Sequence, residues 1–417
     1  METGAQSPDK GGIDKDATAA ASSKTNKTVT ATYSDVLLPA NSESTPAVSI
    51  VLPTLNEEDG IAECINRIVA ALESMGIQGE IIISDSSTDR TPEIARAKGA
   101  IVVEPDQPGY GYAYQYAFDR CRSEYIAMGD ADTTYDFKEL PKLYSHVANG
   151  DADIAMGSRL EGEIKPGAMP NLHQYVGNPL LTAFLNAFYD TDVTDAHSGM
   201  RVMTRDALEE MELTTTGMEF ASEMIMEAGA SDLTIAEEPI TYHERTGEAT
   251  LDSFRDGWRH VRFMLENAPG YLFTGPGLAF LVFGVVIIGG VFSSATLGPA
   301  GFGLHSLIAG SLCVVIGFQA LTLGIFAKIS GDPVRSPADP LTTFLVDHLS
   351  LEYSLAAGIG ILGLGIAYAV AMVGRWISSG FQRLPLLQFD ILVMMAIVVG
   401  LLVIFNAFFL SIVVSQR

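Results

Sequence analysis

The sequence is poor in basic residues and in cysteine. It has 417 residues, of which only 25 are Lys or Arg against 50 Asp or Glu, and the formal net charge is −25. A protein that holds nucleic acid through bulk charge needs a basic surface to neutralise phosphates, so we expect no nucleic-acid partner. The three cysteines, Cys64, Cys121 and Cys313, lie far apart and form no CxxC pair. A disulfide scaffold or a cysteine-based zinc site is therefore not expected.

Charged residues are nearly absent from the C-terminal third. Residues 269–327 contain no Asp, Glu, Lys or Arg, and residues 269–417 hold five acids and five bases. The whole net charge lies in residues 1–268, which excludes a uniform soluble globule. The length predicts roughly two to three domains. The acidic N-terminal part with few lysines indicates a high-salt cytoplasm, in which hydrated carboxylates keep protein soluble; an acidic protein of an ordinary cytoplasm is the alternative.

Four apolar stretches in the C-terminal third are long enough to cross a bilayer. A spanning helix needs about 20 apolar residues for roughly 30 Å of hydrocarbon. We predict a four-helix transmembrane domain over residues 269–417, with spans at about 271–293, 304–327, 354–374 and 391–414. The chain is therefore expected to be a multi-pass protein of the cell membrane.

Basic residues near the spans indicate the orientation. Four arginines precede the first predicted span: Arg245, Arg255, Arg259 and Arg262. Such residues favour the cytoplasmic side, so we expect the N-terminal domain in the cytoplasm. Arg375 and Arg383, on the predicted outer side, argue against this.

Two shorter segments flank the soluble domain expected over residues 46–250. Residues 1–45 are rich in Ala, Ser, Thr, Lys and Asp, which predicts a disordered tail. Residues 251–268 place apolar residues at helical spacing with arginines beside them, which predicts an amphipathic juxtamembrane helix. This helix lies either at the membrane surface or against its own domain.

Short β-rich runs alternate with helical segments in residues 48–237. This alternation predicts an α/β domain with a mainly parallel sheet that helices cover on both faces. Candidate strands are 48–52, 80–84, 100–104, 125–129 and 153–157, and candidate helices are 59–75, 91–98, 110–121, 137–148 and, in two pieces, 205–229. Ligands of such sheets bind at the carboxyl ends of the strands, so the residues that follow each run are candidate site residues.

Acids or an arginine follow four of the predicted strands. The segments are PTLNEE at 53–58, SDSSTD at 84–89, DAD at 130–132 and SR at 158–159. In so acidic a protein, any one acid is most simply a solvated surface group, but here four strand ends converge. Two carboxylates two residues apart, as in Asp130 and Asp132, can bind one hard divalent cation, which in turn grips a diphosphate.

These motifs resemble a known family. VSIVLPTLNEEDGI, EIIISDSSTDRT, YIAMGDADTTYD, DIAMGSR and DAHSGMRVMTRDAL, in that order, are similar to family 2 glycosyltransferases of the GT-A (nucleotide-diphospho-sugar transferase) fold. Within the family, the motifs resemble those of dolichol-phosphate mannose and glucose synthases and of their bacterial undecaprenyl-phosphate counterparts. Some archaeal members also carry a four-span membrane domain, which together with the acidic composition indicates a haloarchaeal protein. The resemblance covers about residues 46–250.

The resemblance implies transfer of one sugar from a nucleotide-sugar, UDP- or GDP-linked, to the phosphate of a membrane polyprenol such as dolichyl phosphate. Such an enzyme supplies lipid-linked sugar for glycosylation, and neither the sugar nor the nucleotide follows from the motifs. A lipid phosphate is already anionic near neutral pH, so it needs cations beside it and no general base. The expected outcome is inversion by direct displacement.

The resemblance also implies roles for individual residues. The expected donor-binding residues are Pro53, Leu55, Glu57, Asp85, Asp130, Ala131, Asp132 and Arg245. Asp130 and Asp132 would hold Mg²⁺ or Mn²⁺. Arg159 would bind the acceptor phosphate, with His173 and Arg201 as further candidates, and Asp132 and Arg159 would be the catalytic residues.

The chain departs from the family pattern at three places. The segment DSSTDRT lacks a second acid that many relatives have, and Thr134 stands where a metal-ligating Gln is frequent. Thr250 stands where the family places a basic residue, so no role is carried over to that position.

Three further features have competing interpretations. The run GYGYAYQY from Gly109 looks like a phosphate-cradling loop but lacks the Lys-Ser/Thr of a P-loop, which favours a flexible loop beside the active site. Glu219 and Glu223 share one helical face, and a solvated acidic face is favoured over an acceptor contact. His243 and His260 either touch lipid phosphate or are ordinary surface histidines.

Two other functions compete with the synthase. A processive polysaccharide synthase also joins this fold to membrane spans, but its QxxRW signature is absent from the sequence. A transport or scaffold protein for lipid-linked sugars would keep only nucleotide binding. Its spans would be expected to carry ionisable residues, which the predicted spans lack.

Overall fold

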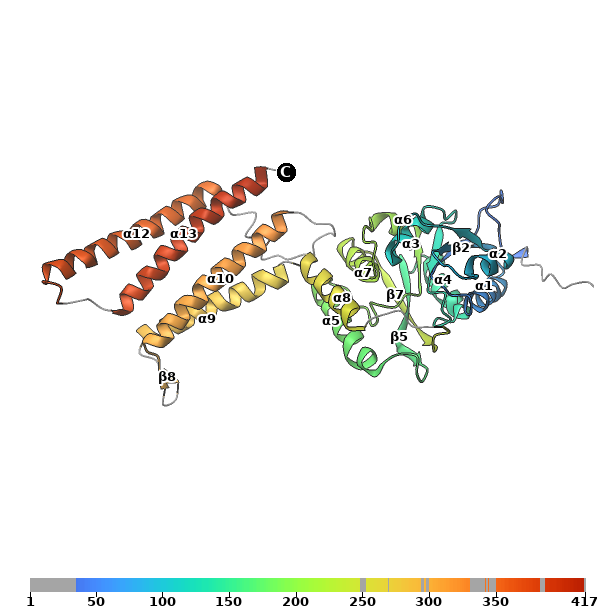
Figure 1. Cartoon of the computed structure of the whole chain (residues 1–417), viewed down its shortest axis with the longest axis horizontal. Coiled ribbons are helices and arrows are strands. Elements are labelled where there is room, and N and C mark those ends of the chain that lie inside the picture. The colour runs from blue at the N-terminus through green and yellow to red at the C-terminus, as the bar shows by residue number, and fades with distance from the viewer. Residues whose placement is uncertain are drawn as a thin grey trace, which may run out of the picture.

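The computed structural model describes residues 35–247, 253–268, 270–293, 296–297, 300–330, 342, 344, 350–382 and 387–415. The predicted disordered tail, residues 1–45, lies for the most part outside these residues, and so does Thr250. Figure 1 shows an α/β domain at one end and four long helices at the other. The expected fold class, a GT-A-like α/β domain followed by apolar helices, is confirmed.

A seven-stranded sheet forms the centre of the α/β domain. Its strands are β1 (Val48–Thr54), β2 (Gly79–Asp85), β3 (Ile101–Val103), β4 (Tyr125–Met128), β5 (Ile154–Ile164), β6 (Arg201–Thr204) and β7 (Ile235–Tyr242). They lie in the order β3-β2-β1-β4-β6-β5-β7. Neighbours are parallel except β6, which runs antiparallel to both β4 and β5. Strands β1 and β2 are buried almost throughout, as expected of central parallel strands.

Helices cover both faces of the sheet. They are α1 (Ile61–Met75), α2 (Thr91–Ala97), α3 (Tyr110–Phe118), η2 (Phe137–Glu139), α4 (Leu140–Ala148), η3 (His173–Gly177), α5 (Asn178–Tyr189), α6 (Arg205–Glu210) and α7 (Phe220–Ala230). On one face, Ile65 of α1 and Leu143 of α4 pack with Ile50 of β1. On the other, Phe118 of α3 and Met224 of α7 pack with Val51 of the same strand. Successive side chains of β1 thus point to opposite faces of the sheet and pack in two separate hydrophobic cores.

The second half of the sheet differs from the pattern expected along the chain. The structure adds α5, β6 and β7, and β5 continues to Ile164 where the sequence predicted an end at residue 157. The register of β5 against β7 shifts between Ser158 and Glu163. Arg159 therefore lies within β5, at the irregular part of the strand, and not in a loop after it.

Helix α8 (Ser253–Asn267) joins the domain to the membrane helices. His260, Met264 and Asn267 are buried, whereas Trp258 is 59% exposed. Met264 belongs to the same core as Tyr189 of α5, and the Tyr189 hydroxyl donates to the Asn267 carbonyl oxygen at 3.2 Å. One face of α8 thus packs on its own domain while the other is open, and Figure 1 places α5 and α8 on the side nearest the long helices.

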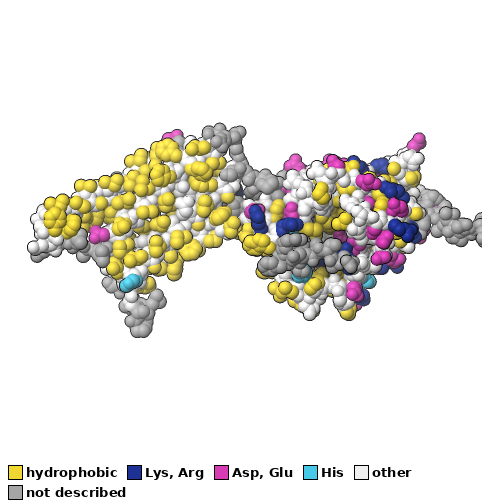
Figure 2. Space-filling view, in the orientation of Figure 1, with side chains coloured by type: hydrophobic (Ala, Val, Ile, Leu, Met, Phe, Trp, Pro, Cys, Tyr) yellow, Lys and Arg dark blue, Asp and Glu magenta, His cyan; other side chains and the backbone are white. Residues whose placement is uncertain are grey.

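Four of the described helices are long and apolar enough to cross a membrane: Gly270–Phe292, Leu304–Ile329, Glu352–Ser378 and Gln388–Val413. They correspond to η4 (Gly270–Thr274) with α9 (Gly275–Phe292), to α10 (Leu304–Ser330), to α12 (Leu351–Ser378) and to α13 (Leu387–Ser415). Two short strands, β8 (Thr296–Leu297) and β9 (Ala300–Gly301), follow α9. Figure 2 shows an almost continuous apolar surface over these helices and mixed charges over the α/β domain.

The membrane helices pack in pairs through small residues. A Cβ atom at Gly284 of α9 would lie 2.5 Å from the Gly310 carbonyl oxygen of α10, and one at Gly400 of α13 would lie 2.8 Å from the Leu362 nitrogen of α12. Such close approach of backbones is a common way for helices to associate where lipid gives no hydrophobic driving force.

Candidate active site

The loops that follow β1 and β2 are tied to each other. The Thr54 hydroxyl donates to Asp85 Oδ1 at 2.7 Å, and the backbone N–H of Glu57 donates to the Thr91 hydroxyl at 2.9 Å. Asp85 is buried. Because β1 and β2 are parallel neighbours, both strands end at the same edge of the sheet. The structure therefore places two predicted donor residues, Glu57 and Asp85, at that edge.

Three predicted donor residues contribute backbone or apolar surface. Pro53 lies in β1 in register with Ser84 of β2. Leu55, just beyond, is 54% exposed, so it offers apolar surface to a ligand. Ala131 is buried, and its carbonyl oxygen accepts from the Cys64 thiol at 3.2 Å. Ala131 thus fixes the backbone between the two acids that flank it.

Asp130 is held by a residue that the sequence analysis did not select. The Tyr110 hydroxyl, at the start of α3, donates to Asp130 Oδ1 at 2.9 Å. On the other side, a Cβ atom at Gly199 would lie 3.1 Å from Asp130 Oδ2, so a side chain at this position would press on the carboxylate. In the sequence, Tyr110 belonged to the tyrosine-rich run after Gly109, which was interpreted both as the start of a helix at 110–121 and as a flexible loop near the site.

Asp132 is oriented by its own loop. The Thr134 hydroxyl and backbone N–H both donate to Asp132 Oδ1, at 2.5 and 3.1 Å. Thr133 between them has φ 68°, a left-handed conformation that is strained for a β-branched residue. Thr134, which stands where relatives frequently have Gln, therefore fixes one oxygen of Asp132 and leaves the other to face the site.

Arg245 lies over the two loops because β7 leads its backbone there. The Thr246 N–H donates to the Asp132 carbonyl oxygen at 3.0 Å, and the Arg245 guanidinium pairs with Glu57 and lies 3.5 Å from Asp132 Oδ2. Burial raises the pKa of Glu57 to about 7, although the Arg245 charge opposes this. Three predicted donor residues from distant parts of the chain thus meet in one charged cluster.

Asp130 and Asp132 fit a hard divalent cation as an incomplete ligand set. Burial, and then the Asp132 charge, raises the pKa of Asp130 to about 6, and a bound cation would relieve this repulsion. Among the described residues, no three or more His, Cys, Asp or Glu side chains gather as a metal site would require. Since Mg²⁺ commonly binds one or two carboxylates and completes its shell with substrate phosphates and water, this donor set suits a cation that arrives with a diphosphate.

Arg159 forms a buried ion pair that the sequence analysis missed. Its Nε and Nη2 donate to the two carboxylate oxygens of Asp195 at 2.7 and 2.8 Å, and its backbone N–H donates to Oδ2 at 3.0 Å. Both side chains are buried. Burial alone would raise the pKa of Asp195, but the Arg159 charge holds it below its usual range. Asp195 belongs to the sequence motif DAHSGMR, but nothing in the sequence indicated that it would pair with Arg159.

The backbone around Asp195 is held from several sides. Glu237 of β7 accepts from the N–H groups of Thr194 and Asp195, at 2.5 and 3.1 Å. Arg201 is 1% exposed, and its guanidinium donates to the carbonyl oxygens of Ser198 at 3.0 Å and of Ala196 at 2.9 Å. Arg201 thus lies beneath the site and binds backbone. This placement gives it the role of supporting the Asp195 segment and not of facing an acceptor phosphate.

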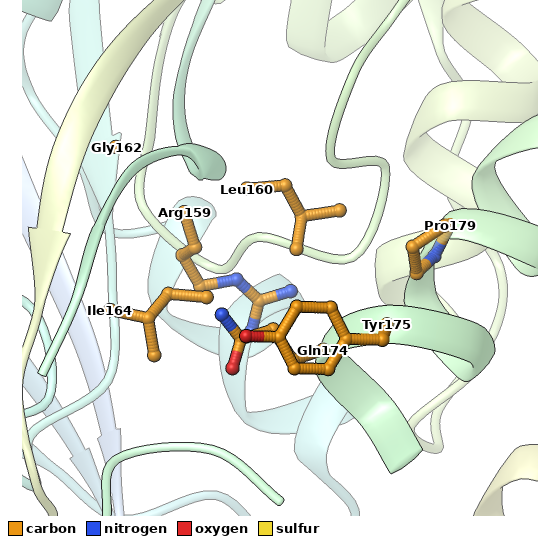
Figure 3. A pocket seen from close by; sticks show the side chains of 7 residues that line it. All are labelled: Arg159, Leu160, Gly162, Ile164, Gln174, Tyr175 and Pro179. Atoms are coloured by element: carbon orange, nitrogen blue, oxygen red, sulfur yellow. The ribbon is translucent and has the colours of Figure 1, made fainter. Parts of the chain in front are cut away.

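A pocket of about 270 Å³ opens beside Arg159 (Figure 3). It is lined by Arg159, Leu160, Gly162, Ile164, Gln174, Tyr175 and Pro179. Figure 3 shows Gln174 and Tyr175 reaching toward the Arg159 guanidinium from the segment that leads into α5. His173, one residue earlier, is partly buried and is not among the residues that line the pocket. The charge of Arg159 also acts on Asp130, which places the pocket near the donor cluster.

Two competing interpretations of the sequence are decided by packing. The N–H groups of Gly111 and Tyr112 at the start of α3 donate to the carbonyl oxygens of Gly217 and Thr216, so this helix end is occupied and does not cradle a phosphate. A Cβ atom at Gly109 would lie 2.3 Å from the Thr216 oxygen, which explains the glycine there. The expected flexible loop is therefore wrong, because the run forms helix α3.

The expected solvated acidic face is wrong for Glu223. This residue is buried, and its carboxylate accepts from the N–H and hydroxyl groups of Thr214 and Thr215. His260 is buried as well, at 9% exposure, so it is neither a surface histidine nor open to a lipid phosphate.

Two parts of the chain match known family models. Residues 49–212 match the model described as glycosyl transferase family 2, and residues 332–414 match the model described as glycosyltransferase family 2 C-terminal transmembrane region. The first match contains Asp130, Asp132, Arg159 and Asp195, and the second falls within the apolar C-terminal third.

Individual proteins are similar over different lengths. The low-salt glycan biosynthesis hexosyltransferase Agl6 of Haloferax volcanii is 58% identical over 377 residues, which cover 90% of this chain and 91% of that relative. A dolichyl-phosphate hexose transferase of the same organism is 34% identical over 213 residues, 50% of this chain and 89% of the relative. A solved structure, glucosyl-3-phosphoglycerate synthase from Mycobacterium tuberculosis with Mn²⁺, UDP and glucosyl-3-phosphoglycerate, aligns with a TM-score of 0.43 and 23% identity over 53% of this chain and 78% of that one.

Proposed function

The chain belongs to glycosyltransferase family 2, and we propose that this membrane glycosyltransferase moves a single sugar from a nucleotide-sugar to the phosphate of a membrane polyprenol such as dolichyl phosphate. The observation that carries the proposal is the charge pattern of the site. The half-buried carboxylate of Asp130, the buried carboxylate of Asp132 and the buried guanidinium of Arg159 lie at one edge of the sheet, in a chain that continues into four apolar helices. The name of a similar protein, a dolichyl-phosphate hexose transferase, supports this acceptor.

On the donor side, Asp130 and Asp132 would hold Mg²⁺ or Mn²⁺ together with the diphosphate. When bound, the cation supplies positive charge to the diphosphate as it departs. Tyr110 and Thr134 orient the two carboxylates through their hydroxyl groups. Arg245 would exchange part of its contact with Glu57 for the diphosphate, and exposed Leu55 and buried Asp85 would border the nucleotide.

On the acceptor side, Arg159 would bind the lipid phosphate. Asp195 accepts from the Nε–H and from one N–H of Nη2, so both N–H groups of Nη1 and the second of Nη2 remain for a ligand. Charge-assisted hydrogen bonds from a guanidinium to a phosphate are among the stronger ones in proteins. Leu160 and Ile164 line the same pocket and offer apolar walls for the first carbons of the lipid.

The reaction would need no proton transfer by the enzyme. A phosphate oxygen of the lipid forms a bond to the anomeric carbon while the bond from that carbon to the diphosphate breaks, and the electron pair leaves with the nucleoside diphosphate. Because no carboxylate of the protein bonds to the sugar, direct displacement inverts the anomeric centre. Positive groups on both sides of the sugar hold two anions in reach of each other.

The membrane helices would keep the enzyme beside its lipid substrate. Sugar nucleotides are cytoplasmic metabolites, so the α/β domain would face the cytoplasm. The product, a lipid-linked sugar, would serve glycan assembly, and the name of the hexosyltransferase relative supports such a role.

The test uses the full chain in liposomes that contain dolichyl phosphate, at high salt with Mg²⁺ or Mn²⁺. A panel of labelled UDP- and GDP-linked sugars is added, and label is counted in the organic phase. We expect one donor to give labelled lipid, and Asp132→Asn to abolish it. Binding of nucleotide without lipid product from any donor contradicts the proposal and favours a transport or scaffold protein instead.

A further inference from the structure

Three side chains form a hydrogen-bonded chain between α8 and the core of the α/β domain. His260 of α8 bonds through Nδ1 to the Ser222 hydroxyl of α7 at 2.9 Å, and the same hydroxyl bonds to His197 Nε2 at 3.2 Å. The two imidazole rings lie 4.9 Å apart and nearly perpendicular. Ser222 is fully buried and His260 is 9% exposed, so water does not compete for these bonds.

The number of protons determines which of the three side chains donates each hydrogen bond. Ser222 has a single hydroxyl hydrogen, so it donates to one histidine and accepts from the other. His197 Nδ1 is buried without a partner. A buried N–H without a partner is rarer than an unfilled acceptor, so Nδ1 is the bare nitrogen and Nε2 carries the proton. His197 therefore donates to Ser222, and Ser222 donates to His260.

The far end of the chain reaches the partner of Arg159. His197 belongs to the segment 194–199, which also carries Asp195, the residue that binds the Arg159 guanidinium through both oxygens. The side chain of His197 is thus the point at which α7 and α8 contact the segment that orients Arg159. A shift of this segment changes where the guanidinium points, because Asp195 also binds the backbone N–H of Arg159.

Helix α8 has a second tie to the domain, which does not use a side chain of this segment. The Tyr189 hydroxyl of α5 donates to the Asn267 carbonyl oxygen at 3.2 Å, one helical turn after Met264. The two ties hold the same helix but reach the segment differently. The histidine chain ends on the side chain of His197, whereas α5 contacts the segment away from Tyr189, through the Thr182 hydroxyl that accepts from the Ala196 N–H at 3.2 Å. The structure therefore contains its own control.

We propose that His197, Ser222 and His260 are positioning residues that link the seating of α8, the last helix before the membrane, to the orientation of Arg159. The proposal rests on the proposed function, in which Arg159 binds the acceptor phosphate. An α8 that is correctly seated at the end of the membrane domain holds Arg159 ready for a lipid phosphate. The same segment reaches the donor cluster only at its far end, where Gly199 lies beside Asp130, so we expect the larger effect on the acceptor side.

The first test measures separate KM values for donor and acceptor in the full chain in liposomes. Ser222→Ala removes both hydrogen bonds, and we expect the KM for dolichyl phosphate to rise about five- to tenfold and the KM for the nucleotide-sugar to change less. His260→Leu should act in the same way. His260→Asn restores an acceptor near the position of Nδ1 and should recover much of the loss. Tyr189→Phe is the matched control and should leave both KM values unchanged.

The second test reads the segment itself by hydrogen exchange of the same proteins. The backbone amides of residues 194–199 should exchange faster in Ser222→Ala and at the wild-type rate in Tyr189→Phe. An active Ser222→Ala enzyme with unchanged acceptor KM overturns the link, as does an equal effect of Tyr189→Phe. If the wild-type chain transfers no sugar to any polyprenyl phosphate, the proposed function fails, and unchanged exchange of residues 194–199 in Ser222→Ala then overturns the link independently.

Discussion

Two parts of the site balance their charges in opposite ways. We call them the donor edge, with Glu57, Asp130, Asp132 and Arg245, and the acceptor edge, with Arg159 and Asp195. At the donor edge, burial raises the pKa of Asp130 to about 6 and that of Glu57 to about 7, and neighbouring carboxylates add to the effect. At the acceptor edge, Arg159 has a buried counterion in Asp195, whose pKa is held below its usual range against the effect of burial. The donor edge is thus completed by its ligand, whereas the acceptor edge is assembled before any ligand arrives.

The largest difference between the two edges is expected in the free energy of unfolding when one acid is neutralised on each side. Asp195→Asn leaves Arg159 buried without a counterion, which should lower the free energy of unfolding by about 3–5 kcal/mol. Asp130→Asn removes one of two repelling charges and should keep or raise stability at pH 7 without added metal. Chemical unfolding in detergent measures both variants. Equal losses of stability would remove the contrast between the two edges.

At the donor edge, neutralising an acid should cost much activity and little stability. Asp132→Asn should lower the rate of sugar transfer roughly 10²–10³-fold, since it removes charge on the diphosphate side, with little change of the melting temperature. Asp190→Asn, at the exposed C-terminal end of α5, is the matched neutralisation and should keep full activity. A similar rate for both variants contradicts the role given to Asp132.

Acid should weaken the acceptor side through His197. Burial, and then the His260 charge, lowers the pKa of His197 from 6.5 to about 3. Between these values the unfolded chain binds the proton that the folded chain excludes, so stability falls by about 1.4 kcal/mol for each pH unit below 6.5 and is unaffected above it. Unfolding at pH 7.5, 6 and 5 should show a flatter profile for His197→Asn than for wild type. The same pH dependence in both proteins would contradict this prediction.

The smallest effect should come from one hydrogen bond at the donor edge. Tyr110→Phe removes the bond to Asp130, a loss of about 1 kcal/mol, so the Mg²⁺ or Mn²⁺ concentration for half-maximal activity should rise about fivefold. Tyr112→Phe, on the same helix, loses only a bond to exposed Asp106 and should behave as wild type. No shift in Tyr110→Phe would mean that Asp130 needs no such support.

The donor edge was accessible to sequence reasoning because its information is local. Each acid comes at the end of a short apolar run, since Asp85 is the last residue of β2 and Asp130 comes just after β4, and parallel strands bring such positions to one edge. The membrane helices were accessible for a similar reason, since composition alone separates a lipid-facing helix from a soluble one. The individual roles of the donor residues stay predictions.

The acceptor edge could not be read in the same way because its contacts are distant in the chain. Asp195 binds Arg159 across 36 residues, and the two meet only because β6 and β7 flank β5. Strand β6 has four residues, too few for a periodic signal. Glu223 was misread for the same reason, since the threonines that bury it lie in a turn whose position no local pattern gives.

The antiparallel strand β6 determines how far apart the two substrates are presented. It separates β4, which leads to the acids proposed to bind the diphosphate, from β5, which carries the arginine proposed to bind the lipid phosphate. Adjacent strands lie about 4.8 Å apart, so one intervening strand spaces β4 and β5 by roughly 10 Å. That interval is comparable to the length of a hexose with a phosphate at one end. The sheet thus works as a molecular ruler, which sets the gap that the transferred sugar has to bridge.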